Sequence, residues 1–198
     1  MNSKTRKPNH DVLIVFSAPS GSGKTTIINK VFSEMDGLVY SVSSTTRPKR
    51  ANETDDVEYE FLTHEQFMEA VDEGDFIEYE GVHGYQYGTR KSKIKKELER
   101  GDKLIFDIDV LGALSIKKLF PAALLIYIDV PSLDVLRERL LSRGSENEKA
   151  IEKRMKRYSF EKSKASEFDR IVLNDDLEQA TREVIIIIRN YIENEIDR

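Results

Sequence analysis

Apolar residues in this chain gather in short, almost uninterrupted runs. Four of these runs are rich in β-branched and aliphatic residues and lie at residues 12–16, 104–108, 123–128 and 170–173. Runs of this length and composition are typical of strands that are buried on both faces, as in a parallel sheet. A fifth strand is predicted at residues 38–42.

Between these strands, apolar residues recur at helical spacing. The predicted helices cover residues 24–35, 91–100, 111–119, 132–141 and 177–195. Strands that alternate with helices predict an α/β fold with a parallel sheet and right-handed crossovers.

Two segments break this alternation. The first, at residues 44–88, holds short aromatic-rich pieces around one short helix near residues 64–72, and it predicts a small α+β insertion. The second begins with a polar stretch at 142–148 that precedes a basic helix, and it predicts a flap or lid. We therefore expect one domain with a core at about 11–43, 89–141 and 165–198, an insertion at about 44–88 and a lid at about 142–164.

A glycine- and serine-rich segment directly follows the first strand and opens a helix. It fits the phosphate-loop pattern G-x-x-x-x-G-K-[ST] except that Ala18 stands at the first glycine position. Gly21 and Gly23 would let successive backbone N–H groups point inward, where the helix N-terminus adds positive charge. Lys24 could then reach the β- and γ-phosphates of a nucleotide, and Thr25 could ligate Mg²⁺. The residues of this predicted ATP-binding loop are Ala18, Pro19, Ser20, Gly21, Ser22, Gly23, Lys24, Thr25 and Thr26.

Ala18 has a consequence for the backbone. An alanine is tolerated at this position if its φ angle is negative. The pattern otherwise predicts a sheet of the P-loop NTPase type, flanked by helices.

Two further groups of side chains suit a phosphorylated ligand. A buried strand ends in Asp107 and Asp109, and the ends of parallel strands face the ligand crevice. Arg47 and Arg50 follow a run of hydroxyl residues, and arginine forks match phosphate oxygens. Both groups also have an interpretation without function: the aspartates could simply end a strand, and the arginines could lie in a solvated basic loop. The aromatic-rich insertion could likewise be no more than its own small core.

Composition narrows the possible functions. The chain has 198 residues, no cysteine, three histidines and a net charge of −5. Disulfides, thiolate chemistry and a histidine-rich metal centre are therefore not expected, and neither is general nucleic-acid binding. The longest apolar run, at 122–128, is far shorter than the roughly 20 residues of a spanning helix. We expect a cytoplasmic protein with no membrane partner, and its oligomeric state is left open.

Together these motifs resemble guanylate kinase, a P-loop kinase family of nucleoside monophosphates. The resemblance extends from about residue 11 to residue 189, and several motifs occur in the family's order. They are the segments at 17–26, 41–50, 76–78, 84–89, 106–112, 142–144 and 171–175.

The resemblance implies phosphorylation of GMP, and of dGMP, by ATP with Mg²⁺. It implies that Lys24, Arg50, Arg143 and Arg154 are catalytic, the last two acting from the lid. The implied GMP-binding residues are Ser43, Arg47, Arg50, Tyr59, Glu78, Tyr87, Thr89 and Asp107. Asn174 and Asp175 would lie near the adenine of ATP, and Thr25 would ligate the metal.

Two other functions stay open at this point. One is a guanylate-kinase-like module that binds a protein partner without catalysis. The other is a P-loop kinase for a different phosphorylated small molecule. The lysine and arginines named above favour catalysis, and Glu78 in an aromatic-rich insertion favours recognition of a base.

Overall fold

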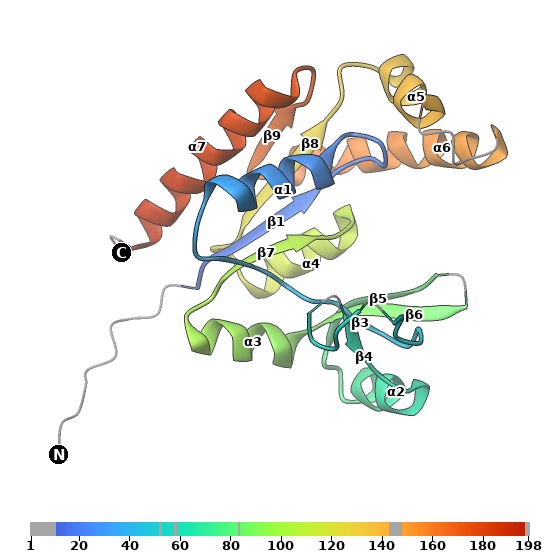
Figure 1. The fold of residues 1–198 in the computed structure, drawn as a ribbon, viewed down its shortest axis with the longest axis vertical. Helices are drawn as coiled ribbons and strands as arrows, with labels where there is room; N and C mark the ends of the chain where they lie inside the picture. Colours follow the sequence, from blue (N-terminus) through green and yellow to red (C-terminus); the bar gives the residue numbers. More distant parts are fainter. Residues whose placement is uncertain (1–10, 52, 58, 83, 143–147, 197–198) are drawn as a thin grey trace.

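The computed structural model describes residues 11–51, 53–57, 59–82, 84–142 and 148–196 (Figure 1). Five parallel strands form the central sheet in the order β2-β7-β1-β8-β9. Their bounds are β1 (Leu13–Ser17), β2 (Leu38–Tyr40), β7 (Lys103–Asp107), β8 (Leu124–Asp129) and β9 (Arg170–Leu173). The predicted α/β class and parallel sheet are confirmed.

Helices cover both faces of this sheet, because its strands alternate buried side chains between two apolar clusters. One cluster joins Ile14 and Phe16 to α1 and α7. The other joins Leu13 and Val15 to α3, α4 and a short 3-10 helix that precedes β9. The helix bounds are α1 (Lys24–Glu34), α3 (Lys91–Arg100), α4 (Val110–Leu119) and α7 (Leu177–Ile196), and the 3-10 helix is η1 (Ala165–Glu167).

The predicted insertion forms a second, four-stranded sheet in the order β4-β3-β6-β5. It contains β3 (Ser44–Thr45), β4 (Glu60–Phe61), α2 (His64–Asp72), β5 (Phe76–Val82) and β6 (Tyr85–Arg90). Phe67 of α2 stacks on Phe76 with ring centroids 4.3 Å apart, and the pair forms a small core of its own. Thr63 and Gln66 form a capping box that begins α2.

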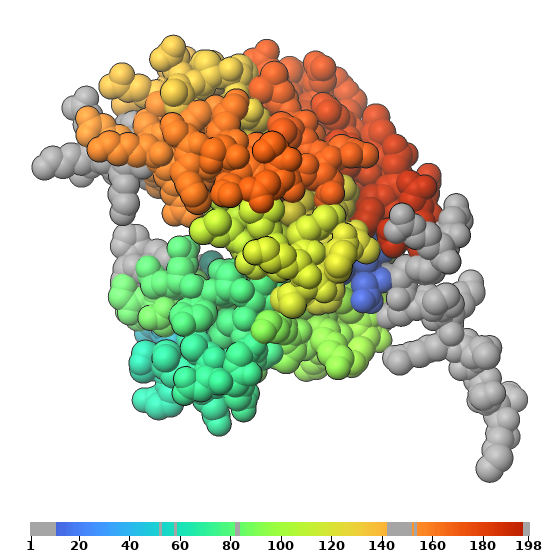
Figure 2. All heavy atoms as spheres, turned by 180° about the vertical axis from the view of Figure 1, so that it is seen from behind, coloured from blue at the N-terminus to red at the C-terminus, as the bar shows by residue number. Residues whose placement is uncertain are grey.

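The core continues with α5 (Leu133–Ser142), and the predicted lid at about 142–164 contains α6 (Glu148–Lys164). Figure 1 shows that α6 and the β5–β6 hairpin project to the same side of the molecule, with α4 between them. In Figure 2 the orange α6 and the green insertion are separate masses on either side of α4. No helix among the described residues is long and apolar enough to cross a membrane.

Candidate functional site

The phosphate loop follows the central strand β1 and leads into α1. Gly21 and Gly23 have φ angles of 95° and 91°, which only glycine adopts without strain. Among described non-glycine residues, only Asp56 has a positive φ, so Ala18 meets the condition expected for it. The loop therefore has the backbone shape that its glycines predict.

The loop is also fastened from behind by side chains of two other elements. The buried Asn174 amide, after β9, donates a 2.6 Å hydrogen bond to the Ser22 carbonyl. Arg139 of α5 donates to the carbonyls of Ser22 (3.4 Å) and Asn174 (2.9 Å). A side chain at Gly23 would collide with the Asn174 amide. In this structure Asn174 therefore supports the loop, while Asp175 is exposed.

Lys24, at the start of α1, lies over the end of strand β7. Its ammonium forms an ion pair with the Asp107 carboxylate and donates a 3.4 Å hydrogen bond to the Ile108 carbonyl. Thr25 and Thr26 are exposed in the first turn of the same helix. The structure thus brings the predicted phosphate lysine and the predicted base-reading aspartate into direct contact.

The donor set around Lys24 suits Mg²⁺. The Thr25 hydroxyl and the Asp107 carboxylate are hard oxygen ligands, which Mg²⁺ prefers. No three His, Cys, Asp or Glu side chains gather around one point within the described residues. Mg²⁺ in nucleotide sites uses one or two protein oxygens together with phosphate oxygens, and this donor set fits that arrangement.

Glu78 of β5 lies next to α4. Thr89 of β6 donates a 2.6 Å hydrogen bond to one carboxylate oxygen of Glu78. Burial raises the pKa of Glu78, and the Thr89 hydrogen bond opposes that rise only in part. A Cβ placed on Gly112 of α4 would lie 3.0 Å from the Glu78 side chain, so glycine leaves room for it. Glu78 is thus a desolvated acceptor with a fixed orientation.

Arg47 is held within the insertion by a partner that the sequence did not indicate. Its two terminal nitrogens donate to the two oxygens of Glu53 at 2.9 and 2.7 Å. Its guanidinium also lies 5.4 Å from the ring centre of Tyr59, which meets Tyr87 edge to face. The prediction that Arg47, Tyr59 and Tyr87 share one place is consistent with these contacts.

The remaining predicted GMP ligands are less constrained. The Arg50 side chain is 70% exposed and lies 4.0 Å from Glu53. Ser43 takes part in the second sheet through its backbone carbonyl, which accepts from the Glu60 amide at 3.0 Å.

On the lid side, Arg154 of α6 reaches the phosphate loop, where its guanidinium contacts the Ser20 hydroxyl. Arg157, one turn further along α6, donates to Asp109 at 3.2 Å and to Glu161 at 2.8 Å. Arg143 lies outside the described residues. Three residues of this region were not predicted from the sequence because they lie in no motif identified there: Glu53, Arg139 and Arg157. Their contacts are seen only in the folded structure.

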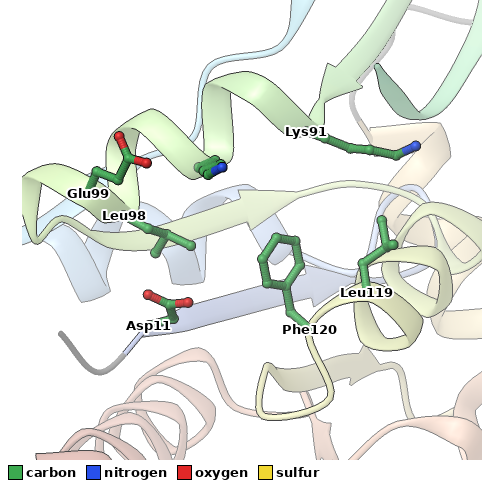
Figure 3. Close-up of a pocket in the computed structure, with 7 residues that line it drawn as sticks. Asp11, Lys91, Leu98, Glu99, Leu119 and Phe120 are labelled. Carbon is green, nitrogen blue, oxygen red and sulfur yellow. The ribbon is translucent and has the colours of Figure 1, made fainter. Parts of the chain in front are cut away.

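Two hollows lie at the opposite end of the central sheet. Figure 3 shows the first, of about 500 Å³, where Asp11 precedes β1 and Phe120 lies between β1 and α3. The second, of about 770 Å³, lies beside Leu124, where β8 begins. The phosphate loop follows the other end of β1, so neither hollow belongs to this site.

The chain matches the family model for guanylate kinase over residues 10–191. It is 45% identical over 181 residues to a guanylate kinase of Chlorobium luteolum, covering 91% of this chain and 92% of that protein. A guanylate kinase of Thermotoga maritima is 44% identical over 178 residues, covering 90% and 86% of the two chains. The crystal structure of guanylate kinase from Anaplasma phagocytophilum matches with a TM-score of 0.66 and 28% identity, covering 91% and 85%.

Proposed function

The chain belongs to the guanylate kinase family and transfers a phosphoryl group from ATP to GMP, and we propose that the side chains around Lys24 and Glu78 carry out this transfer. Phosphoryl transfer between two nucleotides brings many negative charges together. The protein's task is to position the reactants in line and to neutralise that charge.

The ATP side of the reaction belongs to the phosphate loop. Its backbone N–H groups, opened by Gly21 and Gly23, would surround the β-phosphate, and Lys24 would bind β- and γ-phosphate oxygens. Thr25 and Asp107 would hold Mg²⁺, directly or through water, and the ion would neutralise charge on the leaving group. Asn174 and Arg139 keep the loop in shape from behind.

The GMP side belongs to the insertion. Guanine presents its N1–H and N2–H₂ donors side by side, and the Glu78 carboxylate would accept from both. Adenine has an acceptor at N1, so it would oppose the lone pairs of Glu78 and be rejected. Thr89 and Ser43 would complete base recognition, whereas Asp107, which pairs with Lys24, would serve the metal instead of the base. Arg47, Arg50, Tyr59 and Tyr87 would bind the phosphate.

The attacking group needs no general base, because the GMP phosphate is already anionic. Arg154 and Arg143 of the lid, with Arg50 of the insertion, would bind the equatorial oxygens of the transferring group. Placing two of these arginines on a lid excludes water when both substrates are bound and so suppresses ATP hydrolysis. We propose that the reaction takes place in the cytoplasm and that dGMP is also a substrate.

One observation carries the site assignment: Glu78 is fixed by Thr89 beside the helix that follows Asp107, and Asp107 pairs with Lys24. In the proposed mechanism, a guanine acceptor and a phosphate lysine would therefore line adjoining sides of one site. A module that binds only protein has no need of this pairing, and a kinase for a sugar phosphate has no need of Glu78.

The test is a coupled assay of the purified protein with ATP and Mg²⁺ against GMP, dGMP, AMP, CMP and UMP. We expect GMP and dGMP to be phosphorylated and AMP to be rejected. Lys24→Ala should keep the fold, checked by circular dichroism, and lower turnover by ~10³ or more. Near-normal GDP production by the folded Lys24→Ala protein would contradict the mechanism, and inactivity of the wild type with GMP would contradict the function.

A further inference from the structure

Among the described side chains of helix α6, three basic ones contact the core. Arg154 contacts Ser20 of the phosphate loop. Arg157 contacts Asp109 in the turn between β7 and α4. Lys162 donates a 2.7 Å hydrogen bond to Asp129 at the end of β8. Each contact joins the helix to a core element that ends at the catalytic edge of the sheet.

The Arg157 contact is the middle one of the three, and it involves two carboxylates. The Arg157 guanidinium lies between two carboxylates, with its Nε bonded to Glu161 at 2.8 Å and a terminal nitrogen bonded to Asp109 at 3.2 Å. Glu161 is only 6% exposed, so it cannot move away from Arg157 without leaving a buried charge unpaired. This fixes the direction in which Arg157 extends from α6.

Asp109 is equally constrained. One of its oxygens accepts a 2.9 Å hydrogen bond from the Gly112 amide and caps α4, while the other accepts from Arg157. Gly112 is also the residue against which Glu78 packs. The Arg157–Asp109 pair therefore joins the lid helix to the start of α4, which also lies against Glu78.

We propose that Arg157 is a positioning residue for phosphoryl transfer: by bonding Asp109, it seats α6 so that Arg154 reaches the phosphate loop. The proposal rests on the function proposed above. Arg154 lies one turn before Arg157 on the same helix, so a rotation or tilt of α6 about the Asp109 contact would move Arg154 away from Ser20. Small displacements of a charge-stabilising group are costly to catalysis.

The expected effect is on turnover rather than on stability. The Arg157 side chain is 53% exposed, and exposed ion pairs contribute little to folding. Met155 and Tyr158 pack α6 against the apolar cluster of α5, so the helix should stay folded without Arg157. Its orientation relative to the core should become more variable.

The experiment is a double-mutant cycle with Arg157→Gln and Asp109→Asn, in steady-state assays of GMP phosphorylation. Asn caps a helix as well as Asp does, so Asp109→Asn removes the ion pair and keeps the cap. Each single variant should lower kcat by about 10-fold with the KM values for GMP and ATP unchanged, and the double variant should be no slower than either single. Arg157→Lys should recover part of the loss.

The matched control is Lys156→Gln, which removes one positive charge from the neighbouring, exposed position of α6. It should leave kcat unchanged. An Arg157→Gln protein as active as this control would overturn the proposal. So would single effects that multiply in the double variant, because the two residues would then act separately. These outcomes are read against an active wild type, so they are distinct from failure of the proposed function.

Discussion

The insertion and the lid helix both project from the same edge of the central sheet, but they are held in different ways. The insertion has its own sheet, an aromatic pair at Phe67 and Phe76, and a capped helix. Its Arg47–Glu53 pair is internal. Helix α6 has no such interior and packs its apolar residues on α5, while its basic residues bond to the core.

This difference matches two tasks. Reading a base requires a rigid acceptor, and the Glu78–Thr89 bond is made between two paired strands of one small sheet. Charge neutralisation is needed only when both nucleotides are in place, so a helix whose position depends on contacts with the core suits that role. Substitutions in the lid helix should accordingly affect turnover, and substitutions in the insertion should affect its stability or GMP binding.

The largest effect is expected from the lid. In the proposed mechanism, the positive charge of Arg154 binds the oxygens of the transferring phosphoryl group. Arg154→Ala removes this charge, so kcat should fall by about 10³-fold. Binding of GMP should be unchanged, because the insertion is internally held. Steady-state kinetics and calorimetric titration of GMP measure the two quantities. Lys156→Ala, an exposed neighbour, is the control, and a comparable loss of GMP affinity in Arg154→Ala would contradict the separation.

The next effect tests whether the insertion is held by its own core. Phe67 is fully buried against Phe76, and Phe67→Ala should destabilise the insertion by about 3 kcal/mol, the scale of a large-to-small core change. Amides of α2 and β5 should exchange hydrogen faster, while those of β1 and β8 keep their protection. Met68→Ala, at an exposed position, should change neither set. Equal loss of protection in both sheets would show that the insertion has no separate stability.

Some parts of the fold could be predicted from the sequence more accurately than others. Buried strands and the phosphate loop could be predicted because each depends on residues that are adjacent in the chain. The insertion's helix, predicted near residues 64–72, has these bounds in the structure, where Thr63 and Gln66 cap its start. In contrast, β2 ends at Tyr40, before the predicted residue 42, and β6 runs to Arg90, past the predicted boundary at 88.

Site residues follow the same rule. Lys24 and Glu78 lie in recognisable motifs; in the structure Lys24 pairs with Asp107 at the end of β7, and Glu78 accepts a hydrogen bond from Thr89 within the second sheet. Arg139 and Arg157 act through partners far away in the chain, at Ser22 and Asp109. An isolated arginine on a charged helix has no local signal for such a partner. These contacts depend on how helices cross the sheet, which no short sequence pattern specifies.

A smaller effect, on GMP affinity, is expected when the Glu78 carboxylate is replaced. Glu78→Gln keeps the shape of the side chain but turns one acceptor into a donor, which would oppose a guanine N–H. GMP affinity should fall by about 2 kcal/mol, roughly 30-fold in Kd, and rejection of AMP should weaken. The matched control is Glu80→Gln at an exposed position of the same strand. Unchanged GMP affinity in calorimetry would show that Glu78 does not read guanine.

The smallest effect tests the internal charge pairing of the insertion by pH. Hydrogen bonds from Arg47, then from the Arg50 amide, lower the pKa of Glu53 from 4.5 to about 2, and its side chain is 9% exposed. Because the folded-state pKa is depressed, ionised Glu53 stabilises the fold fully above pH 4.5, and this stabilisation is lost as the pH falls toward 2. Glu53→Gln should therefore be less stable than the wild type at pH 7, with a difference that narrows below pH 4.5. Urea unfolding followed by circular dichroism between pH 7 and pH 3 measures the two curves, and Glu69→Gln at an exposed position of α2 serves as the control. Two curves that stay parallel across this range would mean that Arg47 and Glu53 do not stabilise the insertion as an ion pair, and the contrast with the lid would then rest on the aromatic core alone.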